Sequence, residues 1–174
     1  TCALPICPSS SPFRHVDELK TGISVPGLHI KELLSLSEKK LAELRGTHRI
    51  IVYTCDHGCP VDGVDDEQTA SLSLPCSALL PPAFVDYVLR RDLADGVLIT
   101  GCREGDCHYR LGDTWMAQRF AGERMPILRT RVPRERVRLS WLGFQGGDEL
   151  SERLRLFRGD LERVAESSLQ EKLL

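Results

Sequence analysis

Two pairs of cysteines carry the clearest chemistry in the sequence. Cys55 and Cys59 are the ends of CDHGC, and Cys102 and Cys107 stand in GCREGDCHYR, with Cys76 between the two pairs. Thiolates are soft ligands that suit zinc and iron–sulfur clusters, and a 2Fe-2S cluster takes four of them, two on each iron. Two pairs in loops that also contain glycine and aspartate therefore predict a 2Fe-2S cluster.

Other interpretations of the same cysteines stay open at this point. A C-x2–4-C spacing is typical of structural zinc; Cys55 and Cys59 satisfy it, and Cys102 and Cys107 match it at the upper limit. CREGDCH also resembles a lengthened haem-attachment motif with His108 as axial ligand. Buried cysteines can act as small apolar side chains, and a cysteine beside a histidine is a weak sign of a hydrolase.

The composition is that of an ordinary soluble globular protein. Of the 174 residues, 41% are apolar and 28% are charged, and the net charge of −2 argues against a nucleic-acid binder that depends on phosphate contacts. No apolar run has the length of a membrane span. We therefore expect a cytoplasmic protein that reaches a membrane only through a partner or a fused segment. Seven cysteines in that compartment favour metal or redox chemistry over disulfides.

Hydrophobic periodicity predicts strands that alternate with helices. Strands are expected at 49–54, 71–76, 96–102 and 136–143, and helices at 30–44, 81–96, 114–125 and 148–170. Apolar stripes are expected in the first helix at Leu33, Leu34, Leu36, Leu41 and Leu44, and in the last at Leu150, Leu154, Phe157, Leu161 and Val164. Alternating strands and helices imply a parallel sheet covered on both faces.

We therefore expect an α/β fold of three layers, αβα, with a small parallel sheet of the flavodoxin or Rossmann-like type. An irregular N-terminal arm at 1–28 and a linking helix at 29–47 precede the α/β domain at 48–168. Cys55, Cys76 and Cys102 fall at the ends of three predicted strands. Because sites in open α/β sheets form at the carboxyl ends of strands, we expect these cysteines to share one edge of the sheet.

From about Arg49 to Val164 the chain resembles the delta subunit family of methyl-viologen-reducing hydrogenase. The likeness lies in IVYTC followed by GC, in PCS at Cys76, in PAFVDYVLRRDLADGVLITGCREGDCHY and in PRERVRLSWLG. The family pattern is a helix that runs into ADGVLVAGC and then a GDCHY block. The first cysteine loop here is one residue longer than the family's usual Cys-x-x-Cys.

The resemblance implies an electron-transfer subunit with a single 2Fe-2S cluster. Such a subunit passes electrons between a catalytic subunit of the hydrogenase or formate dehydrogenase type and a heterodisulfide-reductase-like partner, and FAD belongs to that partner. The implied candidate ligands are five: Cys55, Cys59, Cys76, Cys102 and Cys107. The two close pairs are favoured, with Cys76 as a near neighbour or a substitute for Cys59. Cluster and partner should meet around Asp106–Arg110 and the loop at 55–66.

The N-terminal arm departs from this pattern. CALPICPSSSPFR resembles the tail of a ferredoxin-type 4Fe-4S segment, in which proline follows the last cysteine. Cys2 and Cys7 do not suffice for a cluster by themselves. Either the segment belongs to a longer fusion with further clusters, or it is a remnant that serves in docking; we favour the remnant.

Overall fold

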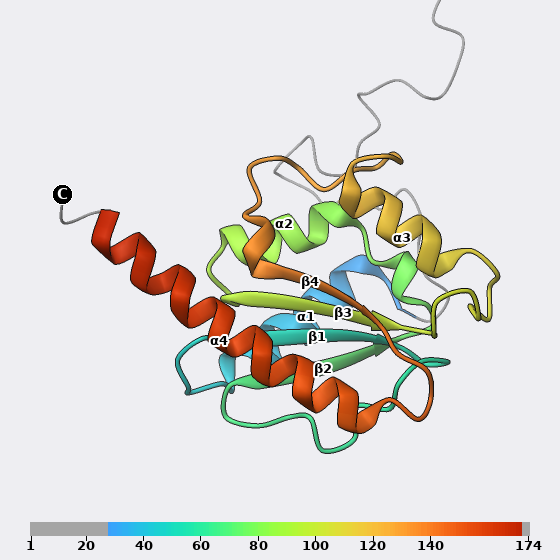
Figure 1. Cartoon of the computed structure of the whole chain (residues 1–174), viewed down its shortest axis with the longest axis horizontal. Coiled ribbons are helices and arrows are strands. Elements are labelled where there is room, and N and C mark those ends of the chain that lie inside the picture. The colour runs from blue at the N-terminus through green and yellow to red at the C-terminus, as the bar shows by residue number, and fades with distance from the viewer. Residues whose placement is uncertain (1–27, 172–174) are drawn as a thin grey trace, which may run out of the picture. The chain divides into compact units, whose positions relative to one another are not determined.

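The computed structural model describes residues 28–171, and a sheet of four parallel strands organises them. The strands are β1 (Ile50–Cys55), β2 (Thr69–Leu74), β3 (Gly96–Gly101) and β4 (Val137–Trp141). Their order across the sheet is β2-β1-β3-β4, and every neighbouring pair is parallel. The parallel sheet expected from the sequence is therefore confirmed (Figure 1).

Among the described residues, helices and two short 3-10 turns precede, connect and follow the strands. They are α1 (Ile30–Ala42), η2 (Ser77–Leu79), α2 (Pro82–Arg90), α3 (Gly112–Ala121), η3 (Arg134–Arg136) and α4 (Gly147–Glu171). The chain divides into two compact units, Thr1–Lys39 and Lys40–Leu174. The sheet and the helices α2, α3 and α4 all belong to the second unit. Cys2, Cys7 and nearly all of the predicted arm at 1–28 lie outside the described residues, and the predicted domain boundaries stay a prediction.

Each predicted helix and strand is present, with shifted ends. The helix predicted at 81–96 ends at Arg90, because Asp92 has a left-handed backbone with φ of 51°. The helix predicted at 114–125 begins at Gly112 and ends at Ala121, because Gly122 is left-handed with φ of 89°. Leu36, which the sequence placed on the apolar stripe of the first helix, is 44% exposed, so that part of the prediction is wrong.

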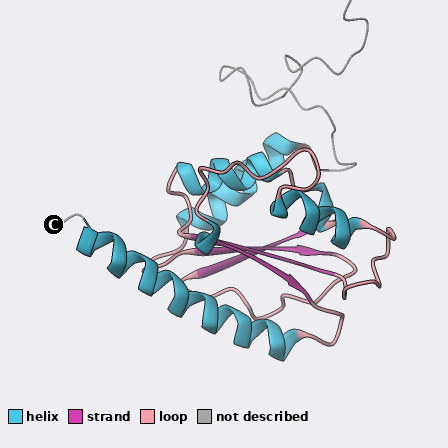
Figure 2. Cartoon of the chain, turned by 45° about the horizontal axis from the view of Figure 1, so that its top comes forward, coloured by secondary structure: helices cyan, strands magenta, loops and turns pink. Residues whose placement is uncertain are grey.

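The sheet is covered on both faces, which makes the expected three layers. Figure 2 shows α4 on one side of the strands and α2 and α3 on the other. On the α4 side, one cluster of buried residues combines Ile50, Val52, Cys59, Leu98, Leu142, Leu150, Leu154, Phe157 and Leu161. On the opposite side, the ring of Tyr53 meets the ring of Phe84 edge to face at 6.0 Å. The stripe predicted for the last helix is confirmed at its first four positions.

An ion pair joins α4 to the start of β2. The Asp66 carboxylate accepts hydrogen bonds from the backbone N–H groups of Gln68 and Thr69 and from the guanidinium of Arg158. Partial burial by itself would raise the pKa of Asp66, but these bonds, that from Gln68 first, together hold it below its usual value. Its charged form therefore stabilises the folded state above the pKa of the unfolded chain, and the stabilisation is lost as the pH falls through the folded-state pKa.

We predict that Asp66→Asn lowers the free energy of unfolding by less than about 1 kcal/mol at neutral pH, because the side chain is 45% exposed. The difference from the wild type should shrink as the pH falls below about 4. Urea unfolding of both proteins at pH 7 and at about pH 3.5 measures it. A difference that grows on acidification would contradict the assignment.

Among the described residues, none of the helices has the length and apolar character needed to cross a membrane.

Candidate metal centre

The topology of the sheet brings two of the predicted cysteines together. From β1 the chain passes to β2 at one edge, and later crosses to β3 on the other side of β1. The carboxyl ends of β1 and β3 thus form the switch point where open α/β sheets bind ligands. Cys55 is the last residue of β1 and Cys102 directly follows β3, and their sulfurs stand 3.9 Å apart.

That separation suits a shared metal ion. Two thiolates on one tetrahedral ion, with metal–sulfur bonds of about 2.3 Å, stand about 3.8 Å apart. The backbone of His57 contacts both sulfurs: its N–H donates to Cys55 Sγ at 3.4 Å, and its carbonyl accepts from Cys102 Sγ at 3.5 Å. The loop after β1 therefore holds the two sulfurs in place.

Cys76 and Cys107 meet at the start of α3. A Cβ added to Gly112 would lie 3.0 Å from the sulfurs of both cysteines, so both border this glycine. The Gly112 N–H donates to Cys107 Sγ at 3.3 Å. Because the first N–H groups of a helix have no partners within it and carry positive partial charge, this end of α3 favours a thiolate.

The loop after β3, which contains Cys107, is anchored to the same end of α3. The buried carboxylate of Asp113, in the first turn of α3, accepts a hydrogen bond from the Gly105 N–H at 2.9 Å. Gly105 itself has a φ of 78°, and Arg110 has one of 77°, so the loop contains two tight left-handed bends. Gly112 and Asp113 were not predicted as site residues, although an acidic residue just ahead of a helical pattern is a usual sign of a helix start.

Cys59 lies apart from the other four. It is 1% exposed and belongs to the apolar cluster between the sheet and α4. Its thiol faces the Pro60 carbonyl at 3.3 Å, and burial raises its pKa. Of the five predicted site residues, the structure thus brings together Cys55, Cys76, Cys102 and Cys107, and places Cys59 in the core.

The two histidines beside the cysteines stack on each other. The rings of His57 and His108 are 3.7 Å apart, with an angle of 12° between their planes, and Tyr109 meets both edge to face. All three side chains are exposed. The stack joins the loop after β1 to the loop after β3.

Hydrogen bonds between the thiols, together with burial, shift the pKa values of the gathered cysteines in different directions. The hydrogen bond between Cys55 and Cys76 is the largest cause for both: it raises the pKa of Cys55 and lowers that of Cys76. Burial raises the pKa of Cys102 to about 11. Adjacent thiolates repel one another, so this donor set fits a cation that would compensate their charge.

Among residues 28–171, no group of three or more Cys, His, Asp or Glu side chains converges as ligands of a single ion. A dinuclear cluster has a different requirement, because it spreads four thiolates over two metal ions. The gathered thiols, the close pair Cys55 and Cys102, and the N–H donors beside the sulfurs fit that requirement.

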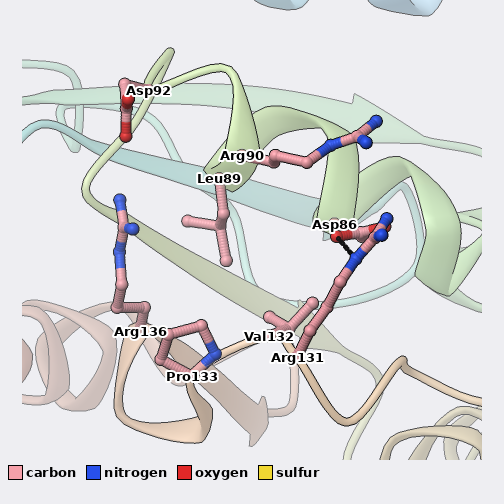
Figure 3. Close-up of a pocket in the computed structure, with 8 residues that line it drawn as sticks. All are labelled: Asp86, Leu89, Arg90, Asp92, Arg131, Val132, Pro133 and Arg136. Carbon is pink, nitrogen blue, oxygen red and sulfur yellow. Dashed lines mark hydrogen bonds and ion pairs between the residues drawn. The ribbon is translucent and has the colours of Figure 1, made fainter.

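A hollow lies near the amino ends of β3 and β4, whereas the thiol centre lies at the carboxyl ends of the strands. Its volume is about 230 Å³, and Leu89, Val132 and Pro133 form its apolar wall (Figure 3). Asp86, only 5% exposed, is paired there with Arg131 through two hydrogen bonds and with Arg129 through a third. These contacts fasten α2 to the segment before β4.

We predict that Asp86→Ala lowers the free energy of unfolding by about 1.5 to 3 kcal/mol, the range for hydrogen bonds to charged groups. Arg129→Ala should cost less, because the Arg129 side chain is 44% exposed and makes one of the three bonds. Urea midpoints of the two variants provide the comparison. Equal midpoints for Asp86→Ala and the wild type would show that the pair does not stabilise the fold.

The fold and the four gathered cysteines define an α/β protein with a thiol centre at the switch point of a parallel sheet. Comparison with protein families then gives the particular family. The family model of the methyl-viologen-reducing hydrogenase delta subunit matches residues 50–165, and the chain belongs to this family. The resemblance found in the sequence over Arg49–Val164 is confirmed.

Relatives of two kinds match the chain: iron-sulfur subunits of hydrogenases and a subunit of a heterodisulfide reductase. The chain is 32% identical over 91 residues to an iron-sulfur subunit of the F420-non-reducing hydrogenase of Archaeoglobus profundus, which is 52% of this chain and 66% of that protein. It is 28% identical over 108 residues to an F420-non-reducing hydrogenase iron-sulfur subunit of Methanococcus voltae, covering 57% and 74%. It is 34% identical over 94 residues to one subunit of the Ferredoxin/F(420)H(2)-dependent CoB-CoM heterodisulfide reductase of Methanosarcina acetivorans, covering 51% and 11%.

The aligned part thus spans less than two thirds of the Archaeoglobus protein and a small part of the heterodisulfide reductase polypeptide.

Proposed function

We propose that the protein relays single electrons through a 2Fe-2S cluster. The observation that carries the proposal is the meeting of four cysteines from three strand-end segments at the switch point of the sheet. The ligands we assign are Cys55, Cys76, Cys102 and Cys107. Relatives whose names describe them as iron-sulfur subunits support the cluster. In this assignment Cys76 replaces Cys59, because Cys59 lies in the apolar core.

The chain's own residues have two tasks in this proposal. The loops after β1 and β3 hold the sulfurs of Cys55 and Cys102, and the first turn of α3 holds that of Cys107 through the Gly112 N–H. Backbone N–H donors to the sulfurs are among the features that tune the potential of such clusters. When bound, the cluster would supply one-electron chemistry, and the protein would make no bonds in a substrate.

The partner we propose is a flavin-containing heterodisulfide-reductase-like protein, which carries the FAD. The match to the Methanosarcina acetivorans heterodisulfide reductase covers 51% of this chain and 11% of that polypeptide, so a segment similar to this chain is part of the same polypeptide there. When two segments are joined in one polypeptide, each is at a high effective concentration for the other, which favours contact between them. A hydrogenase, formate dehydrogenase or other redox subunit would stand on the other side of the relay.

The contact face we propose consists of Asp106–Arg110 and the loop at 55–66. Cys107 is the one thiol of the four that is not fully buried. Next to it, Tyr109 is 54% exposed and Leu111 is 47% exposed. Aromatic and apolar side chains in such a position are typical of interface cores. A partner docked here would bring its cofactor to the most exposed ligand.

A reductive titration tests the relay. Anaerobically purified protein titrated with dithionite should take up about one electron per chain, with loss of its visible absorbance and the appearance of one paramagnetic signal, because a 2Fe-2S cluster holds a single added electron. A structural zinc site is the second candidate, since the 3.9 Å between Cys55 and Cys102 suits zinc as well. A colourless protein that takes up no electrons would favour zinc and overturn the relay.

A further inference from the structure

A half-buried arginine stands behind the thiol centre without a carboxylate partner. Arg119 lies on α3, seven residues after Gly112 and so two turns along the same face of the helix. Its Nε is fully buried and makes no hydrogen bond, and none of the ion pairs among residues 28–171 includes it. A buried cation without a counter-charge is costly, and proteins normally pair it.

Arg119 is linked to the thiol centre through one residue. Its Nη1 donates a hydrogen bond to the Ala78 carbonyl at 2.8 Å. The N–H of Ala78 in turn donates to the sulfur of Cys76. Burial, first, and then the nearby charge of Arg124 lower the pKa of Arg119, and attraction to the Cys76 sulfur offsets part of this. The positive charge of Arg119 therefore acts on the thiol centre both directly and through the backbone that positions Cys76.

We propose that Arg119 is the internal counter-charge of the metal centre: a positioning residue that holds Cys76 through Ala78 and compensates the negative charge of the bound group. The inference rests on the proposed function. Four thiolates and two sulfides outweigh two ferric ions, so the cluster is negative, and an added electron makes it more so. A nearby cation therefore favours the reduced form and raises the reduction potential.

The test compares Arg119→Met, Arg119→Lys and the control Arg124→Met. Arg124 is an exposed cation just beyond the same helix, and it lies over the ring of Trp115. In reconstituted protein, the midpoint potential should fall in Arg119→Met, fall less in Arg119→Lys and change little in Arg124→Met, because an exposed charge is screened by solvent. A purely structural role predicts equal shifts in the Met and Lys variants, or none, and that result would overturn the proposal.

A second readout separates this inference from the proposed function. If the wild type forms no 2Fe-2S cluster, the relay fails, but a divalent ion held by the close pair Cys55 and Cys102 would still lie among four thiolates, and the centre would stay negative. Co²⁺ binding, followed by thiolate-to-metal charge-transfer absorbance, should then weaken on the order of tenfold in Arg119→Met and clearly less in Arg119→Lys. Equal affinities, or a wild type that binds no Co²⁺, would overturn the role of Arg119 as counter-charge.

The apoprotein provides the complementary comparison. Without the bound group, Arg119→Met should unfold in urea at about the same concentration as the wild type, because it removes a hydrogen bond and an uncompensated buried charge together. A strongly destabilised apoprotein would mean that Arg119 serves the fold rather than the centre.

Discussion

Cys102→Ser is expected to abolish the visible absorbance of the purified protein, whereas Cys59→Ser is expected to retain it. Cys102 directly follows β3, and its sulfur stands 3.9 Å from that of Cys55, the distance of two ligands on one metal ion. A serine oxygen is a harder ligand than a thiolate and replaces it poorly on iron. Cys59 is buried among the apolar side chains under α4, so its replacement changes packing and leaves the four gathered sulfurs intact.

The matched series of five single Cys→Ser variants decides between the two ligand sets. Our assignment predicts loss of the spectrum at positions 55, 76, 102 and 107, and retention at position 59. The sequence alone favoured the two close pairs, which predicts retention at 76 and loss at 59. Far-UV circular dichroism of each apoprotein controls for unfolding. Loss of the spectrum in Cys59→Ser with a folded apoprotein would contradict our ligand set.

Gly58→Ala is expected to lower the free energy of unfolding by about 3 kcal/mol and to prevent cluster assembly. An added Cβ would lie 2.8 Å from the backbone carbon and 2.9 Å from the carbonyl oxygen of Gly101, at the end of β3. Backbone atoms cannot rotate away, so the loop after β1 must move off β3. That movement separates Cys55 from Cys102, whose sulfurs the same loop holds.

Gly159→Ala provides the control for this substitution. Gly159 lies within α4, and a Cβ there meets nothing within 4 Å, so alanine should raise stability by about 0.5 to 1 kcal/mol through helix propensity. Urea unfolding of the apoproteins measures both changes, and iron content measures assembly. Gly58→Ala with wild-type stability and iron content would show that the loop does not need its close contact with β3.

The sequence predicts this site well where the backbone of the sheet determines it. Cys55 is the last residue of β1 and Cys102 directly follows β3, the adjacent parallel strand. The apolar and β-branched residues of IIVYTC and GVLITG indicate both strands clearly. The same reasoning applies to α4, where a step of three or four residues places Leu150, Leu154 and Phe157 in the core.

The positions of the other site residues depend on loop conformation and on contacts between distant segments. The spacing of cysteines along the sequence indicates neither of these. Cys59 is close to Cys55 in sequence, yet the turn at Gly58 sends its side chain to the other side of the sheet, toward α4. Cys76 is far from Cys107 in sequence, and they meet only because Gly112 lets α3 approach both sulfurs. Arg119 shows no sequence signal, because its role depends on how α3 packs against η2.

The most direct test of the account is the measurement of iron, zinc and acid-labile sulfide per chain in anaerobically purified protein, with a visible spectrum of the same sample. A 2Fe-2S relay predicts about two irons and two sulfides per chain and a red-brown colour that dithionite bleaches. Zinc without sulfide in a colourless sample would contradict the relay, and the four cysteines would then form a structural site.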